Sequence, residues 1–470
     1  MNKILRNLFS LGFSNIFAQL FAFLFITYYT RTLSKDLVGV INLSQAILVY
    51  FTMMTLYGLQ TYGTKEVAKN KDDKGKIQSL VGNIIGLRLI IAMISFLLII
   101  LIAIFANKGT VFTYVLIIYG ITLFPIAFNI DWFYSGISEM QYNARYNIVK
   151  SIIPVIILVL FLNGDEKFYI IPIGTFMGML MASIYHLIVY RKKSYELTIK
   201  FKPHSNIYYL KAAFPFFLSG MLSMINCNVD TIIIGFLRSD SELALYSTGY
   251  KIIFFLISLI SIIYIPIFPN LISYYSNKEF EKLKELLSYL SKIIVMIAVP
   301  IFIGSIMLSK EIIVFLFKER YLDSYVSFNI LSFYILILFF REIYAYSLNA
   351  WGKEKVYLKI VSISSLLNLI LNFILIPKFG INAAAITTVI SEILNFILMR
   401  KVASSEIKIT YSKYFIKIIP SVLVMILFIK VFSPFHVLIK IIGTIIVYFI
   451  SILVFRYISI EEIKKIIRNK

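Results

Sequence analysis

The chain has 470 residues, of which 60% are hydrophobic and only 15% are charged, and its mean hydropathy is +0.86. Soluble domains contain about 45–50% apolar and about 25% charged residues, so this composition excludes an ordinary soluble protein. Unbroken apolar runs such as 89–106 recur along the chain, whereas strands of a transmembrane barrel alternate apolar and polar residues over about 10 positions. The sequence therefore predicts an all-α, polytopic membrane protein.

The chain carries 46 Lys and Arg against 24 Asp and Glu, a net charge of +22. In a soluble protein this surplus would suggest nucleic-acid binding, but here the basic residues lie mostly between apolar runs, where they set the orientation in the membrane. We therefore expect no nucleic-acid partner. The single cysteine, Cys227, excludes an intrachain disulfide, and His186, His204 and His436 lack metal-ligand spacing, so neither a metal nor a cofactor is expected.

Fourteen apolar stretches are long enough to be candidate membrane spans. In chain order they lie at 8–29, 38–63, 79–106, 111–133, 147–163, 168–190, 210–237, 243–272, 289–308, 325–349, 356–377, 381–400, 413–433 and 435–457. The stretch at 147–163 is short for a bilayer of about 30 Å, and the last two share a tight link at Ser433 and Pro434, so twelve spans is the alternative count. The first stretch follows Lys3 and Arg6 but has no small-residue cleavage site, which favours a retained span over a signal peptide.

Basic residues are distributed unevenly between the two sides of these spans. With the amino terminus inside, the cytoplasmic segments hold 30 of the 46 Lys and Arg, the outer segments hold 11, and five lie within spans. The positive-inside rule then predicts that both termini are cytoplasmic. The outer loops are short, the longest being 309–324, which leaves little chain to hold the acceptor of an external glycan polymerase or ligase. This favours a transport function.

The two halves of the chain show a weak internal repeat. Thr27–Asp36 aligns with Thr231–Asp240 at an offset of 204, and Ser138–Met140 aligns with Lys353–Lys355 at an offset of 215. The aligned segments occupy equivalent places in each half and face the same side, which indicates a parallel repeat of spans 1–6 and 7–12, as in transporters built from repeated bundles. We expect an N-terminal lobe at 1–205, a C-terminal lobe at 206–405, and two additional spans with a basic cytoplasmic tail at 406–470.

Two longer motifs carry a family resemblance. Asp131–Tyr142 (DWFYSGISEMQY) follows the fourth span. Leu348–Lys355 (LNAWGKEK) follows the tenth, and behind it come Asn368, Asn372, Ile376–Ala385 (IPKFGINAAA), Ser391 and Glu392. Over spans 1–12 the chain resembles the polysaccharide-unit (Wzx-type, O-antigen and capsule) flippases of the multidrug/oligosaccharidyl-lipid/polysaccharide exporter superfamily. One departure is Asn382-Ala383, where such sequences often carry a glycine, and it affects packing more than class.

The resemblance implies a V-shaped, multi-pass helical bundle in the bacterial cytoplasmic (inner) membrane. By alternating access, such a flippase translocates undecaprenyl-pyrophosphate-linked oligosaccharide for the biosynthesis of surface polysaccharide, either the O-antigen of lipopolysaccharide or capsule. The implied partners are the lipid-linked oligosaccharide, membrane lipid, H⁺ or Na⁺ as a driving ion, and the polysaccharide polymerase machinery.

Two other functions stay open on the sequence alone. One is a cation-coupled drug exporter of the same superfamily, whose lumen should be more acidic. The other is a membrane-embedded glycan polymerase or ligase, an enzyme that would need longer external loops. Because the sequence has no Gly-x-x-x-x-Gly-Lys-Ser/Thr loop and no Ser/His/Asp set with suitable spacing, we expect a transporter and no catalytic residues.

Charged residues inside the spans are the first candidates for a functional site, because a charge at mid-membrane costs at least about 2.5–3.5 kcal/mol on insertion scales. The cations Arg88, Arg341 and Lys251 are candidates for binding a pyrophosphate in a lumen. Each also has a structural interpretation. Arg341 could pair with the adjacent Glu342, Arg88 could join its helix to a neighbour, and Lys251 could lie at the interface.

Acids and amides inside the spans complete the candidate set. Asp230, Glu342 and Glu392 are lumen acids that could bind the driving ion, although each could instead bond helix to helix. Amide side chains suit sugar hydroxyls and equally suit interhelical hydrogen bonds. The amides that form i,i+4 stripes or share a face with Asp230 are Asn15, Gln19, Asn226, Asn368 and Asn372.

Overall fold

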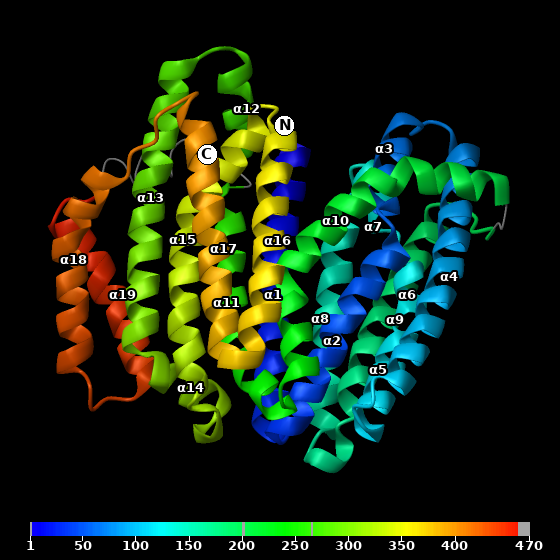
Figure 1. Cartoon of the computed structure of the whole chain (residues 1–470). Coiled ribbons are helices and arrows are strands. Elements are labelled where there is room, and N and C mark those ends of the chain that lie inside the picture. Colours follow the sequence, from blue (N-terminus) through cyan, green and yellow to red (C-terminus); the bar gives the residue numbers. More distant parts are fainter. Residues whose placement is uncertain (1, 200–202, 265–266, 459–470) are drawn as a thin grey trace. The chain divides into compact units, whose positions relative to one another are not determined.

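The computed structural model describes residues 2–199, 203–264 and 267–458, and within its helices it leaves aside the side chains of residues 2–16, 203–206, 219, 222–227, 259, 261 and 262. The described residues form helices and no strand, which confirms the all-α prediction (Figure 1). The chain divides into two compact units, Met1–Lys251 with Asn372–Ile381, and Ile252–Leu371 with Asn382–Lys470. This division does not test the repeat-based boundaries at 205/206 and 405/406, which stay a prediction.

The elements that begin in the first unit run from α1 to α11. They are α1 (Asn2–Thr32), α2 (Lys35–Leu56), α3 (Leu59–Lys69), α4 (Lys74–Phe105), α5 (Thr110–Ile121), α6 (Leu123–Ala127), α7 (Asp131–Gly136), α8 (Gln141–Phe161), the 3-10 turn η1 (Asp165–Lys167), α9 (Ile170–Lys192), α10 (Pro203–Leu237) and α11 (Asp240–Tyr264). The elements that follow are α12 (Phe268–Ser276), α13 (Phe280–Met307), α14 (Ser309–Phe317), η2 (Glu319–Tyr321), α15 (Ser324–Ala350), α16 (Glu354–Phe379), α17 (Ile381–Ser404), α18 (Ser412–Val431) and α19 (Val437–Val454).

Eleven helical segments of the described chain are long and apolar enough to cross a membrane. One of them is α8, which has 21 residues because it begins before the short apolar stretch predicted at 147–163. The closing pair, α18 and α19, are also separate candidate spans despite their tight link. The three remaining predicted spans correspond to α1, α10 and α11, helices of 31, 35 and 25 residues. The chain is thus a multi-pass helical membrane protein.

Backbone geometry interrupts two of the predicted spans, each of which looks continuous in the sequence. The stretch at 38–63 forms α2 and α3, which are separated by Tyr57 and Gly58 with left-handed φ values of 45° and 67°. A Cβ atom on Gly58 would lie 2.6 Å from the backbone nitrogen of Phe217 on α10, so only glycine fits this turn. The stretch at 111–133 is divided as well, into α5, α6 and α7.

The pattern Gly174-x-x-x-Gly178 predicts a close approach between α9 and another helix. A Cβ atom at Gly178 would lie 2.7 Å from Cγ of Pro154 and 2.8 Å from the carbonyl oxygen of Lys150, both on α8. A Cβ atom at Gly174 would also contact Pro154, at 3.6 Å. The prediction is confirmed, because both glycines lie where α9 meets α8.

We expect Gly178→Ala to destabilise the protein by about 1–3 kcal/mol, because the added methyl group must displace backbone or the rigid proline ring of α8. The melting temperature of the full-length protein in detergent measures this effect. Gly164→Ala is the matched control, since a Cβ atom there has no neighbour within 4 Å among the described residues. Equal melting temperatures for the two variants would contradict the close packing of α8 against α9.

Candidate functional site

A buried ion cluster in the second unit joins α15 to α17. The Nε atom of Arg341 donates to Oε1 of Glu392 at 2.6 Å, and its Nη1 atom lies 3.0 Å from Oε1 of Glu342. The side chains of Arg341, Glu342 and Glu392 are 11%, 18% and 5% exposed. Two carboxylates share one guanidinium, so the fully ionised cluster carries a formal charge of −1. The structure thus brings together three residues that the sequence proposed separately as cation and acids.

Neutral polar groups extend this cluster towards α16. The Nδ2 atom of Asn395 lies 3.4 Å from Oε2 of Glu392, and the Ser364 hydroxyl donates to Oδ1 of Asn395 at 2.7 Å. One turn away, Nδ2 of Asn368 donates to the Ser391 hydroxyl at 3.3 Å. Asn368 therefore bonds α16 to α17, which is the interhelical role left open for the amides. The structure also buries Asn372, which belongs to the other compact unit.

Lys251 on α11 lies against α1 and α2 in the first unit. Its ammonium group donates to the hydroxyl of Tyr29 at 2.6 Å and to Oδ1 of Asn42, and it stands 5.0 Å from the centre of the Tyr29 ring. The Tyr29 hydroxyl also donates to Asn42 at 3.0 Å. No carboxylate among the described residues forms an ion pair with Lys251. The contacts of this cation in the described chain are therefore with neutral oxygens and an aromatic face.

Arg88 on α4 is fully buried in the first unit. Its Nη1 atom donates to the carbonyl oxygen of Asn129, between α6 and α7, at 2.7 Å. Asp131 lies close enough to attract the guanidinium. In the described chain, Nε and Nη2 of Arg88 have no hydrogen-bond partner. The contact with Asn129 joins two helical segments, as the structural interpretation of Arg88 expects, while a role in substrate binding stays a prediction.

Asp230 on α10 is only 4% exposed. One carboxylate oxygen accepts a hydrogen bond from the hydroxyl of Tyr246 on α11, and the other accepts from the backbone N–H of Thr231 at 2.8 Å. The carboxylate therefore links α10 to α11. The side chains of Asn226 and Asn15 lie outside the described residues, and Gln19 is half-buried on α1.

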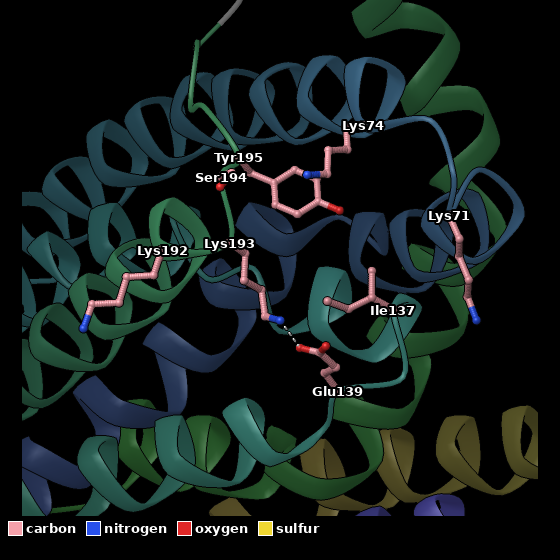
Figure 2. A pocket seen from close by; sticks show the side chains of 8 residues that line it. All are labelled: Lys71, Lys74, Ile137, Glu139, Lys192, Lys193, Ser194 and Tyr195. Atoms are coloured by element: carbon pink, nitrogen blue, oxygen red, sulfur yellow. Dashed lines mark ion pairs between the residues drawn. The ribbon is translucent and has the colours of Figure 1, made fainter.

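Sequence reasoning missed two groups that the structure places beside a candidate residue or in a pocket. Tyr29 and Asn42 flank Lys251, and the only signal was that Asn42 is an isolated amide in an apolar run. The second group lines a pocket of about 550 Å³ at one end of the first unit (Figure 2). Its basic residues are Lys71, Lys74, Lys192 and Lys193, which in the sequence indicated only orientation.

The sequence of this chain matches the models of two protein families. Residues 4–275, more than half of its length, match the family model described as polysaccharide biosynthesis protein. The chain belongs to the polysaccharide biosynthesis protein family. Residues 146–458 also match the model of the lipid II flippase MurJ. These matches confirm the resemblance to polysaccharide-unit flippases that the motifs carry.

Two curated relatives of this polysaccharide biosynthesis protein are described as candidate O-antigen transporters. The protein from Shigella dysenteriae is 22% identical over 233 residues, which cover 50% of this chain and 58% of the relative. The protein from Escherichia coli (strain K12) is 22% identical over 251 residues, which cover 52% of this chain and 59% of the relative. The chain thus matches less than two thirds of the length of either relative.

Solved structures share the fold of this family member over most of its length. The inward closed conformation of the lipid II flippase MurJ has a TM-score of 0.76 and 18% identity, and the match covers 94% of this chain and 97% of the other. The inward-facing conformation of a multidrug resistance MATE family transporter has a TM-score of 0.61 and 15% identity, with coverage of 81% and 95%. At these identities the likeness shows the fold alone.

Proposed function

We propose that the chain is a flippase that translocates undecaprenyl-pyrophosphate-linked oligosaccharide across the bacterial cytoplasmic membrane for surface polysaccharide synthesis. Family membership and the fold shared with transporters support this function. The observation that carries it further is Lys251, a cation inside the helical bundle without an acidic partner in the described chain. Such a group attracts a pyrophosphate, whereas it would repel the cationic substrate of a drug exporter.

In this proposal the cations and the amides inside the bundle contact different parts of the substrate. Lys251 supplies a mobile point charge to the pyrophosphate, with Arg88 as a second cation in the same unit. The amides Gln19, Asn368 and Asn372, and by sequence Asn15 and Asn226, meet sugar hydroxyls or join helices. The prenyl chain stays in lipid, both termini are cytoplasmic, and alternating access exposes the substrate to either side. No catalytic step is proposed, and the polymerase machinery would receive the translocated unit.

A reconstitution experiment tests this function directly. The full-length protein is placed in vesicles that contain an undecaprenyl-pyrophosphate-linked oligosaccharide in the inner leaflet, and a lectin outside reports translocated glycan. We expect lectin binding to grow with time in protein vesicles and to stay at background in empty ones. Export of a fluorescent cation without glycan translocation would favour the drug exporter, and growth of the glycan chain would favour the polymerase or ligase.

We infer that the cluster of Arg341, Glu342 and Glu392 binds the driving ion. Its formal charge of −1 inside the bundle can be neutralised by one H⁺ or one Na⁺, which would change its electrostatic energy during the cycle. Asp230 is the alternative coupling acid, because it is buried and accepts hydrogen bonds from the Tyr246 hydroxyl and the Thr231 backbone N–H rather than pairing with a cation in the described chain.

Glu392→Gln is expected to remove the dependence of glycan translocation on the ion gradient while leaving the protein folded. The substitution keeps the contact of Arg341 with Glu342 and leaves a neutral pair, so no bound ion is needed to compensate the charge. Translocation in vesicles with imposed H⁺ or Na⁺ gradients measures this. Glu279→Gln, which removes an ion pair with Lys282 near the start of α13, is the control and should keep the dependence. An unchanged gradient dependence in Glu392→Gln would move the assignment to Asp230.

A further inference from the structure

Three segments of the first unit converge on the pocket of Figure 2. Lys71 and Lys74 come from the turn between α3 and α4 and from the first residue of α4. Ile137 and Glu139 come from the turn between α7 and α8. Lys192, at the end of α9, and the three residues that follow it complete the wall, so the pocket needs all three segments in place.

The charge of this pocket is strongly positive. Its lining contains four lysines and one acid, Glu139, and Lys193 pairs with that acid at 2.6 Å (Figure 2). In the part of the chain that the structure describes, Lys71, Lys74 and Lys192 take part in no ion pair, and all three are exposed. Three lysines that form no ion pair in the described chain line one cavity, and their flexible side chains favour an anionic occupant.

Contacts within the protein hold the segments around these lysines in place. The ring of Tyr195 packs on Phe133 and stacks on Tyr190, with ring centres 5.1 Å apart in both pairs. The ammonium group of Lys74 lies 5.7 Å from the centre of the Tyr195 ring. The backbone N–H of Glu139 donates to the carbonyl oxygen of Tyr134 at 2.8 Å, which closes the turn that carries the acid. An occupant therefore has to order only lysine side chains.

The pocket lies where membrane spans end. Lys74 is the first residue of one candidate span, and Lys192 is the last residue of another. Residues at the ends of membrane spans lie at the level of the lipid headgroups, where lysine stems follow apolar surface and keep their charge in the polar layer. The basic segments on this side are also those that the positive-inside rule assigns to the cytoplasm, whose leaflet carries anionic lipid.

From this geometry we propose that the pocket binds the phosphate headgroup of an anionic membrane phospholipid such as phosphatidylglycerol. Its cations are lysines only, which attract phosphate as point charges on flexible stems and do not impose the bidentate geometry of arginine. A lipid in continual exchange with the bilayer fits this chemistry better than a transported pyrophosphate. By bridging the α3–α4 turn and the end of α9, the bound headgroup stabilises this end of the unit, whatever the transported substrate is.

Native mass spectrometry of the full-length protein, purified in a neutral detergent and mixed with phosphatidylglycerol, tests the proposal. The test variant is Lys71→Gln, Lys74→Gln and Lys192→Gln combined, which leaves the Lys193–Glu139 bridge intact. We expect the fraction of protein with bound phosphatidylglycerol to fall about tenfold or more, since each lysine near an anionic headgroup contributes substantially to binding. Binding of zwitterionic phosphatidylcholine should not change, and the detergent melting temperature without lipid should stay that of the wild type.

A matched triple variant shows whether lipid is lost because the pocket lysines are gone or because the net charge is lower. Lys284→Gln, Lys355→Gln and Lys401→Gln combined remove the same charge from exposed positions of the second unit, which are predicted to face the same side. This control should retain phosphatidylglycerol as the wild type does, and an equal loss in both variants would overturn the proposal.

Undecaprenyl pyrophosphate added in place of phospholipid distinguishes the two possible sources of the bound phosphate, a membrane phospholipid and the transported lipid. Retention of that lipid but not of phosphatidylglycerol would make the pocket a substrate-loading site and would also overturn the proposal. Neither result depends on measured transport, so the proposed function is tested separately.

Discussion

Arg341→Ala should abolish glycan translocation and lower the stability of the protein by about 3–5 kcal/mol, the usual cost of breaking a buried ion pair from one side. The change removes the cation that Glu392 contacts at 2.6 Å and Glu342 at 3.0 Å, and it leaves two carboxylates facing each other inside a membrane bundle. The amount of folded protein in the membrane and its melting temperature in detergent measure the effect on stability. Translocation is then assayed only on protein that has folded.

Two further variants show whether charge balance is the cause. In the double variant with Arg341→Ala and Glu392→Gln, only one acid remains, so we expect much of the lost stability to return. Arg341→Lys keeps the charge but cannot reproduce both contacts of the planar guanidinium, and it should fall between the wild type and the alanine variant. A normal melting temperature for Arg341→Ala would show that the cluster contributes little to the fold and that its acids do not need this cation.

The fold was largely predictable because a lipid environment imposes one strong constraint. Each of the fourteen predicted stretches overlaps a helix, since apolar runs of this length must satisfy their backbone hydrogen bonds internally. Breaks inside spans were not predictable from hydropathy. Tyr57 and Gly58 end α2 through their backbone conformation, and the requirement for glycine comes from α10, which is distant in sequence.

The candidate site was predictable in its residue types but not in its partnerships. Adjacent residues suggested the contact between Arg341 and Glu342, and the structure confirms it. Glu392 is 51 residues away from Arg341, so their contact depends on how α15 packs against α17, which no local pattern encodes. Asn42 and Lys251 are separated by 209 residues and meet only after α2 and α11 have packed. The same reasoning applies to the pocket, whose lining residues come from three segments that are distant in sequence.

The second large effect is expected from Lys251→Met, which should leave the protein folded and reduce glycan translocation about ten- to a hundredfold. Removing this charge leaves no buried acid uncompensated in the described chain, and Asn42 still accepts a hydrogen bond from Tyr29 at 3.0 Å. A methionine of similar length fills the space among α1, α2 and α11. The translocation loss corresponds to one charge-assisted hydrogen bond to the pyrophosphate, about 1.5–3 kcal/mol.

The role of Lys251 in substrate binding is tested by comparing glycan translocation in two lysine variants. Lys417 also lies within a predicted span, but its side chain is exposed on α18, so Lys417→Met should translocate glycan at the wild-type rate. Lys251→Arg keeps a cation at the site and should retain more activity than Lys251→Met. If Lys251→Met translocates as well as Lys417→Met, with equal amounts of protein in the vesicles, Lys251 only joins α11 to its neighbours. The attraction for pyrophosphate would then have to come from Arg88 alone in this unit, and Arg88→Met would become the decisive variant.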